Sequence, residues 1–230
     1  LTLIDRMPFH GLKPEFYALA AGTKSDKEVR IQFPDSSQIN TVYGEISDID
    51  LDEQMITVGN SKIDYDGLII GLGCEDKYHN VPGAEAYTHS IQTLSKSRET
   101  YHRISELPKG ARVGIVGAGL SGIELASELR ESRSDLEILL YDRGPRILRN
   151  FPEKLSKYIS NWFSKHNVTV VPNSVIDRVE PGKIYNNGKP ENIDLVVWTA
   201  GIQPVEIVRN LPIDMSTSGR VIIKDRKSTR

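Results

Sequence analysis

Cysteine is almost absent from this chain: Cys74 is the single one among 230 residues. One thiol excludes an intramolecular disulfide, a Cys-x-x-Cys redox pair and a thiolate zinc site within the chain. Cys74 follows a glycine-rich turn, and we interpret it as a small buried thiol. The five histidines show no paired spacing, so we expect no metal site.

Long apolar runs and an excess of one charge are also missing. No stretch approaches the roughly 18 apolar residues that a membrane-spanning helix needs. The net charge is −2 with acids and bases interleaved, so the chain as a whole has no field that attracts nucleic acid or anionic lipid. We therefore expect no nucleic-acid partner and no segment that crosses a bilayer.

What is present is the pattern of a globular α/β protein. The hydrophobic content of 38% supports real cores, and the length fits one large or two small domains. Apolar strands alternate with helical segments in the second half, which predicts a parallel sheet with helices on both faces. The expected strands there cover residues 112–116, 135–142 and 194–198, with helices at 120–131 and 151–166.

The strongest motif is the glycine turn Gly117-Ala118-Gly119-Leu120-Ser121-Gly122. It follows the apolar run 113–116 directly and opens a predicted helix. The first glycine permits the tight turn, the second lets a diphosphate approach the backbone, and the third lets helix and strand pack closely. The N–H groups and partial positive charge of the helix start would then receive the diphosphate.

A carboxylate completes this fingerprint. Asp142 ends the next predicted strand, twenty residues after Gly122, where it would accept hydrogen bonds from the adenosine ribose. Its charge would repel a 2′-phosphate, which favours NADH over NADPH. Arg143, Arg146 and Arg149 follow closely and could receive that phosphate, so NADPH stays open as the less favoured ligand.

Three apolar strands that run into turns carry a family resemblance: LIIGLG at 68–73, VGIVGAGLSGIE at 113–124 and VVWTAG at 196–201. Their order resembles the pyridine nucleotide:disulfide oxidoreductase superfamily of FAD-dependent enzymes. Within it the chain is most similar to type II NADH dehydrogenases, which pass electrons from NADH to a quinone. The resemblance implies a Rossmann-like, doubly wound NAD-binding domain beside an incomplete FAD-binding domain.

The resemblance also implies roles for individual residues. Thr199, Ala200 and Gly201 would pass the nicotinamide half of NADH. Glu124 would lie between nicotinamide and flavin and couple to quinone; its other interpretation is a solvated residue stabilised by the helix dipole. Lys13, Pro14 and Tyr17 fall where the family's chain passes the flavin ring, although the string around them departs from the commoner family pattern. The implied FAD residues are Asp5, Arg6, Gly44, Glu45, Gly71 and Gly73.

The same resemblance predicts that the chain is a fragment. The family's FAD glycine turn lies about 30 residues before Leu1, with Asp5 as its ribose acid, and the family's C-terminal region holds the quinone and membrane sites. We predict an incomplete FAD domain at 1–107, an NAD(P)H domain at 108–213 that begins at the Pro108-Lys109-Gly110 linker, and a segment returning to the FAD domain at 214–230. The piece alone is expected to be inactive.

Three functions are compatible with these residues. The first is an FAD-dependent NADH dehydrogenase that donates to a quinone, located in the cytoplasm or peripherally on the inner face of the cell membrane. The second is a soluble NAD(P)H flavin reductase that serves ferredoxin or another acceptor, and the third is a sensor or scaffold that binds NADH without turnover. Hydride transfer between stacked rings needs positioning rather than an acid–base triad, which agrees with a motif made of glycines and ribose acids. A homodimer is left open.

Overall fold

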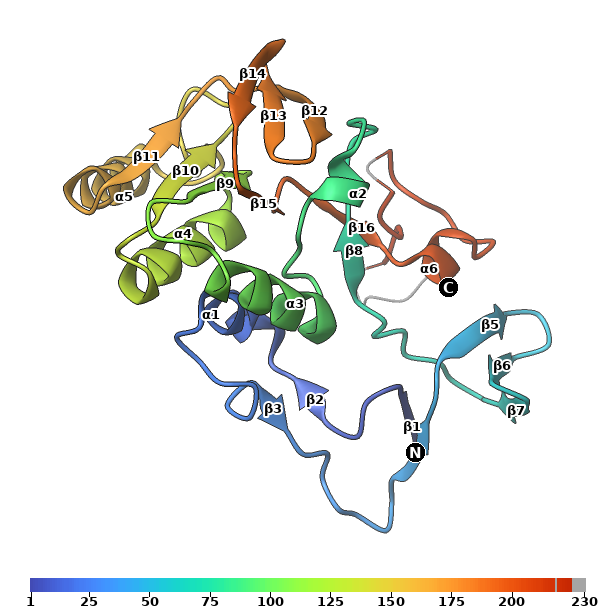
Figure 1. Ribbon diagram of the computed structural model, residues 1–230. Coiled ribbons are helices and arrows are strands. Elements are labelled where there is room, and N and C mark those ends of the chain that lie inside the picture. The colour runs from blue at the N-terminus through green and yellow to red at the C-terminus, as the bar shows by residue number, and fades with distance from the viewer. Residues whose placement is uncertain (218, 225–230) are drawn as a thin grey trace. The chain divides into compact units, whose positions relative to one another are not determined.

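The computed structural model describes residues 1–217 and 219–224 (Figure 1). The chain forms two compact units, and each is discontinuous in sequence. The larger unit contains residues 12–29 and 76–202, and the smaller unit contains residues 1–11, 30–75 and 203–230. We describe each unit by itself.

A four-stranded parallel sheet is the centre of the larger unit. Its strand order is β11-β10-β9-β15, formed by Val168–Val171, Glu137–Tyr141, Arg112–Val116 and Leu195–Trp198. The register aligns Val116 of β9 with Tyr141 of β10 and with Trp198 of β15. Residues that follow the three strands therefore meet at one edge of the sheet. This confirms the predicted parallel sheet.

The side chains of this sheet alternate between two cores, as the two-residue period of a strand requires. Ile115 of β9 and Val197 of β15 enter one hydrophobic cluster, whereas Val116 and Trp198 enter the cluster on the opposite face. Both faces are therefore buried, which explains why the strands read as nearly continuous apolar runs.

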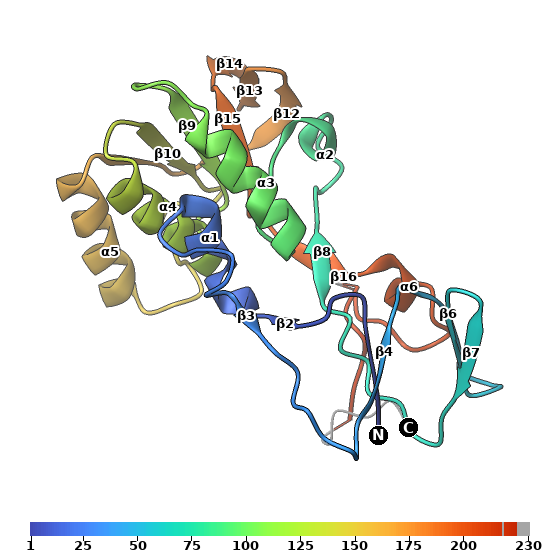
Figure 2. The same cartoon turned by 60° about the horizontal axis from the view of Figure 1, so that its bottom comes forward.

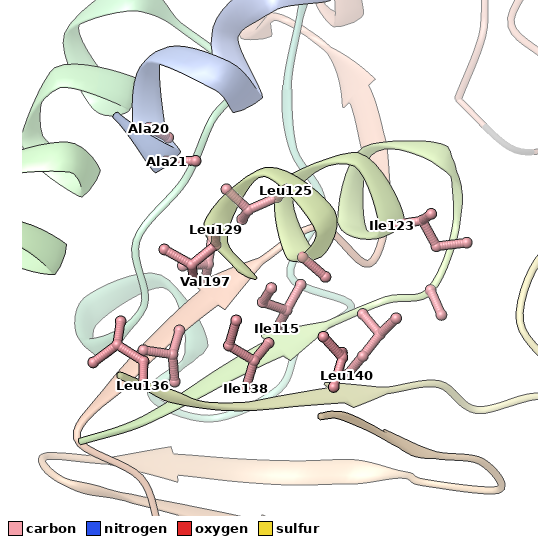
Figure 3. Packing of buried hydrophobic residues seen from close by; sticks show 14 of the residues in the cluster. Ala20, Ala21, Ile115, Ile123, Leu125, Leu129, Leu136, Ile138, Leu140 and Val197 are labelled. Atoms are coloured by element: carbon pink, nitrogen blue, oxygen red, sulfur yellow. The ribbon is translucent and has the colours of Figure 1, made fainter. Parts of the chain in front are cut away.

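Helices cover the first face. They are α1 (Phe16–Ala21), α3 (Leu94–Ser105), α4 (Leu120–Ser132) and α5 (Glu153–Lys165). Figure 1 and Figure 2 both place α1 beside α3 and α4, which it contacts. Figure 3 shows Leu125 and Leu129 of α4 between Ala20 and Ala21 of α1 and the side chains of the sheet. The segment 16–21 is thus part of the core that supports the glycine turn.

The second face differs from the sequence-based expectation. It is covered by the short helix α2 (Ala84–Tyr87) and by an antiparallel sheet of β12 (Ile176–Glu180), β13 (Lys183–Asn186) and β14 (Lys189–Asn192), rather than by long helices. Ile176, Val179 and Ile184 of this sheet are buried against the parallel strands. Turns interrupt the alternation of apolar and polar residues in these short strands, so the sequence did not reveal which surface they cover.

The smaller unit contains several short two- and three-stranded sheets. Parallel β1 (Thr2–Asp5) and β4 (Asn40–Tyr43) align Asp5 with Tyr43. The other elements of the smaller unit or of its junctions are β2 (His10–Gly11), β3 (Arg30–Ile31), β5 (Ile46–Asp50), β6 (Met55–Val58), β7 (Ser61–Asp64), β8 (Cys74–Asp76), β16 (Ile202–Pro204) and α6 (Glu206–Arg209). The 3-10 turn η1 (Lys13–Glu15) leads into α1 of the larger unit.

One expected strand is missing from the smaller unit. The apolar run 68–73 is not assigned to any strand, and the Ile69 side chain is 92% exposed. A strand requires a neighbour that pairs with its backbone, and no such neighbour is present among the described residues of this unit. Of the predicted return segment 214–230, residue 218 and residues 225–230 lie outside the described residues.

The compact units divide the chain at other places than the predicted cofactor domains. Residues 12–29 and 76–107 pack with the glycine-turn unit, although the predicted domain boundary lies at 107/108. The assignment of segments to FAD and NAD was made by resemblance, and it stays a prediction.

Candidate nucleotide-binding site

The glycine turn lies between β9 and α4, as its spacing predicts. Gly117 has φ +108°, and a Cβ atom there would lie 2.8 Å from the backbone of Thr199 and Ala200. A Cβ at Gly122 would lie 1.9 Å from the carbonyl oxygen of Gly117. Two of the three glycines are therefore required by the protein's own packing.

Gly119 has different surroundings. A Cβ atom at Gly119 would have no atom of the surrounding residues within 4 Å. Gly119 is also the N-cap of α4. The first N–H groups of a helix lack intrahelical acceptors, and the helix dipole adds partial positive charge there. The open space beside Gly119 thus faces donors that suit an anionic group such as a diphosphate.

The carboxylate of Asp142 is held in a defined orientation at the end of β10. Its Oδ2 accepts a hydrogen bond of 2.8 Å from the Ala118 N–H, and its Oδ1 accepts one of 2.7 Å from the Gly144 N–H. Each carboxylate oxygen has a second lone pair. The acid is therefore oriented by the glycine turn and can still accept hydrogen bonds from ribose hydroxyls.

A cavity of about 410 Å³ joins these elements. Its volume lies within the range of small-molecule sites, and its lining combines apolar with polar and charged residues. The lining residues come from the ends of three parallel strands and from the segments beside them: His79, Val81, Val116, Gly117, Ala118, Gly119, Tyr141, Asp142, Arg143, Leu148, Arg149, Asn150, Phe151, Ser174, Val175, Ile176, Trp198, Thr199 and Ala200.

The cavity brings together many of the residues expected at a nucleotide site. Gly117, Ala118, Gly119, Asp142, Arg143, Thr199 and Ala200 all line it. Leu120, Ser121, Gly122 and Gly201 are not lining residues, although Gly122 and Gly201 lie in the turns that shape it. The assignment of these residues to NADH stays a prediction.

The three arginines after Asp142 have different environments. Arg143 and Arg149 are exposed and line the cavity. The guanidinium of Arg146 instead donates hydrogen bonds to the backbone carbonyls of residues 148, 149 and 151. Its donors are directed to the protein's own backbone, so Arg143 and Arg149 are the better placed of the three to receive a 2′-phosphate.

The turn at 199–201 is fixed by contacts with the glycine turn and with His79. The Thr199 hydroxyl donates to the carbonyls of Val116 and Gly117 at 3.0 and 2.9 Å. Nε2 of His79 lies 2.8 Å from the carbonyl oxygen of Ala200, which requires the tautomer that carries a proton on Nε2. Sequence reasoning missed His79, because a single histidine in a loop gives no signal of a distant carbonyl partner.

Apart from Arg149, the segments 148–151 and 174–176 were also missed as parts of the cavity. Both follow strands of the parallel sheet in sequence, and their side chains form no motif. The parallel strand order could have indicated residues 174–176, because the carboxyl end of β11 must lie at the same edge as Asp142.

Glu124 lies on the first turns of α4, in a half-buried position beside α1. Burial raises the pKa of Glu124 above its ordinary value of 4.5, and the Glu15 carboxylate raises the pKa further. Glu15 forms an ion pair of 2.8 Å with Lys24, and Glu128 accepts a hydrogen bond from Thr23. Glu124 is thus a partly desolvated acid within a group of carboxylates, which differs from the fully solvated alternative.

The six predicted FAD-binding residues lie in the smaller unit, whereas Lys13, Pro14 and Tyr17, predicted to pass the flavin ring, lie in the larger unit. Asp5 ends β1, and its Oδ1 accepts a 2.8 Å hydrogen bond from the Met7 N–H. The Gly44 N–H donates to the Asp5 carbonyl, so these two residues are neighbours. Arg6 and Glu45 adjoin them in sequence, and Gly71 and Gly73 lie in open space where an added Cβ would meet no atom within 4 Å. A carboxylate at the end of a strand, as at Asp5, suits a residue that binds ribose hydroxyls. The open space at Gly71 and Gly73 would let a cofactor come close to the backbone.

No group of histidine, cysteine and carboxylate side chains within the described residues is arranged to hold a metal ion. In the same part of the chain, no helix combines the length and apolar character that crossing a membrane requires.

Comparison with known families decides the assignment. The family model for pyridine nucleotide-disulphide oxidoreductase matches residues 1–230. The chain belongs to this family. The superfamily resemblance and the Rossmann-like α/β fold expected from the sequence are confirmed.

Curated relatives narrow the comparison within the family. The chain is 53% identical over 224 residues to the NADH dehydrogenase-like protein YutJ of Bacillus subtilis, covering 97% of this chain and 63% of the relative. It is 24% identical over 238 residues to the demethylphylloquinone reductase NdbB of Synechocystis, covering 96% of this chain and 59% of that protein. The chain therefore spans less than two thirds of the length of these relatives.

Solved structures show the same family fold. NDH2 from Plasmodium falciparum in complex with NADH superposes with a TM-score of 0.81 at 18% identity, over 96% of this chain and 54% of that one. The ferredoxin reductase for the CYP199A2 system from Rhodopseudomonas palustris gives 0.79 at 19% identity, over 94% and 56% of the two chains. At these identities the likeness concerns the fold.

Proposed function

We propose that this chain is part of an FAD-dependent NADH dehydrogenase that transfers hydride from NADH to flavin and then reduces a quinone. The observation that carries the proposal is the cavity at the edge of the parallel sheet, where an open helix N-terminus and an oriented carboxylate face the same space. The 53% identity to an NADH dehydrogenase-like protein supports the same activity.

In this proposal the larger unit binds NADH. The backbone at Gly119 and the start of α4 bind the diphosphate, and Asp142 binds the adenosine ribose. The fixed turn at Thr199 and Ala200 orients the nicotinamide half. Because the Asp142 carboxylate disfavours a 2′-phosphate, NADH is the expected substrate, and NADPH, received by Arg143 and Arg149, is the second choice.

The smaller unit would hold FAD through Asp5, Arg6, Gly44, Glu45, Gly71 and Gly73. FAD supplies a two-electron acceptor that matches hydride transfer. The protein's own residues contribute position: two rings must be held about 3–3.5 Å apart for this transfer. The half-buried Glu124, whose pKa is raised by burial and by Glu15, is proposed to hold a proton during coupling to quinone.

The proposed setting is the cytoplasm, with peripheral contact at the inner face of the cell membrane, where a quinone is available. A homodimer stays a prediction. The identity of the electron acceptor depends on more than the fold and the NADH site. A ferredoxin reductase shares the fold, and a soluble reductase would use the same NADH site.

Anaerobic addition of NADH to the full-length protein tests the activity. We expect the flavin absorbance near 450 nm to bleach and to return when menadione is added. A protein that carries flavin but shows no bleaching would leave the sensor or scaffold as the better reading. Steady oxidation of NADH with ferredoxin and none with menadione would assign the soluble reductase instead.

A further inference from the structure

A short strap formed by residues 146–151 makes one wall of the cavity. Four of its residues, Leu148 to Phe151, line the cavity, whereas Arg146 does not. The strap follows Asp142 closely in sequence, and its Leu148 is buried in the core of the larger unit. The strap therefore connects the cavity wall to the core.

Arg146 binds the backbone of this strap with its guanidinium group. Its Nη1 donates to the Leu148 carbonyl at 3.1 Å, and its Nη2 donates to the carbonyls of Arg149 and Phe151 at 2.8 and 3.0 Å. One planar guanidinium thus binds three backbone acceptors within five residues. A lysine ammonium, which is a point charge on a flexible stem, does not reproduce this fixed fork of donors.

The strap has two further anchors. The Leu148 N–H donates to the Ala118 carbonyl in the glycine turn at 3.0 Å, and the buried Ser156 hydroxyl donates to the Ile147 carbonyl at 2.8 Å. Leu148 has φ +49°, a left-handed conformation that costs free energy for a branched side chain and persists only when neighbouring contacts enforce it. The strap conformation is therefore imposed by its contacts.

We propose that Arg146 is a positioning residue that preorganises the 148–151 wall for the adenosine half of the dinucleotide. This inference rests on the proposed NADH site. The wall is tied to Ala118, whose N–H also orients Asp142, so a loose strap would disturb both the ribose acid and the surface beside it. Ordering the strap before binding removes an entropic cost that the ligand would otherwise bear.

The test compares Arg146→Gln and Arg146→Lys in the full-length protein. Both variants are expected to raise the KM and the Kd for NADH by roughly tenfold while kcat at saturating NADH stays within about twofold, because preorganisation affects binding and leaves ring stacking intact. Amide hydrogen exchange of residues 148–151 should increase in the nucleotide-free variants. Arg103→Gln is the matched control, since the Arg103 side chain is 59% exposed on α3 and pairs with Glu106 of the same chain segment at 3.8 Å.

The outcomes are separable. If Arg146→Lys binds NADH as the wild type does, Arg146 acts through charge alone and the positioning role is overturned. Unchanged KM in both variants, or a lower kcat with unchanged KM, would overturn it as well. Should Arg146→Gln fail to fold, Ser156→Ala removes another anchor and is expected to raise KM several-fold. Wild-type protein that binds no NADH would overturn the proposed function itself.

Discussion

At the scale of single residues, the glycines of the turn differ in what they contribute: Gly122 is needed for packing, whereas Gly119 leaves space for a ligand. A Cβ at Gly122 collides with the Gly117 carbonyl at 1.9 Å, whereas a Cβ at Gly119 meets nothing within 4 Å. The backbone of Gly119 also has a negative φ of −78° that alanine adopts without strain. Substitution by alanine should therefore lower the stability at Gly122 and the ligand affinity at Gly119.

We predict that Gly122→Ala destabilises the protein by about 3 kcal/mol or more, because backbone atoms must shift to accommodate the methyl group. Gly119→Ala should change the free energy of unfolding by less than about 1 kcal/mol and yet weaken NADH binding at least tenfold, since the methyl group occupies the space for the diphosphate. Urea denaturation and NADH titration measure the two effects. Normal NADH affinity of Gly119→Ala would contradict the assigned diphosphate position.

Glu124 leads to a prediction about pH. Its folded pKa is raised by burial and then by Glu15, so the folded state binds the proton more tightly than the unfolded state does. The stability associated with the protonated acid is complete below the ordinary pKa of 4.5 and is lost as the pH rises through the folded pKa. At neutral pH the ionised, partly buried carboxylate therefore opposes folding.

Glu124→Gln should consequently become more stable relative to the wild type as the pH rises above 4.5, by a fraction of a kcal/mol up to about 1 kcal/mol. Unfolding curves at several pH values between 4 and 8 measure the difference. Glu131→Gln, on an exposed residue of the same helix, is the control for the loss of one surface carboxylate. A flat difference for Glu124→Gln would contradict the desolvated environment.

At the scale of elements, one buried arginine connects α4 with two strands. Nη1 of Arg130 donates to the Ser134 carbonyl at 2.9 Å, and Nη2 donates to the carbonyls of Leu136 and Asn167 at 2.8 and 3.0 Å. These carbonyls lie in the turn after α4 and just before β10 and β11. The arginine thus closes the end of the sheet opposite the cavity.

We expect Arg130→Met to lower the free energy of unfolding by about 2–4 kcal/mol, because three carbonyls lose charge-assisted donors and all three bonds are in buried or partly buried surroundings. Chemical denaturation measures this loss. Arg103→Met, on an exposed arginine, should change stability by less than about 0.5 kcal/mol. Equal effects of the two substitutions would show that the buried contacts contribute little.

At the scale of the whole molecule, the discontinuous larger unit depends on a segment distant in sequence. Residues 16–21 form α1, and its buried Leu19, Ala20 and Ala21 belong to the same unit as the parallel sheet. A chain of residues 76–202 contains every strand of that sheet but lacks this helix. A chain of residues 12–202 retains it.

The shorter chain should be less stable by roughly 3 kcal/mol, because the surfaces of α3 and α4 that contact α1 become exposed to water. Urea midpoints measure this difference, and binding of a hydrophobic dye should be stronger for residues 76–202. If both chains unfold at the same midpoint, α1 is not an integral part of the unit.

Short periods and fixed spacings were sufficient to predict the glycine turn, the position of Asp142 after the second strand and the parallel direction of the strands. Which segments close the cavity depends on contacts between distant parts of the chain, and these became visible only in the folded structure. Nε2 of His79 lies beside the Ala200 carbonyl, and Arg146 donates to the carbonyls of the strap. Neither contact has a signal in the local sequence. The run 68–73, with its exposed Ile69, also depended on tertiary contacts, because an apolar run becomes a strand only where another backbone pairs with it.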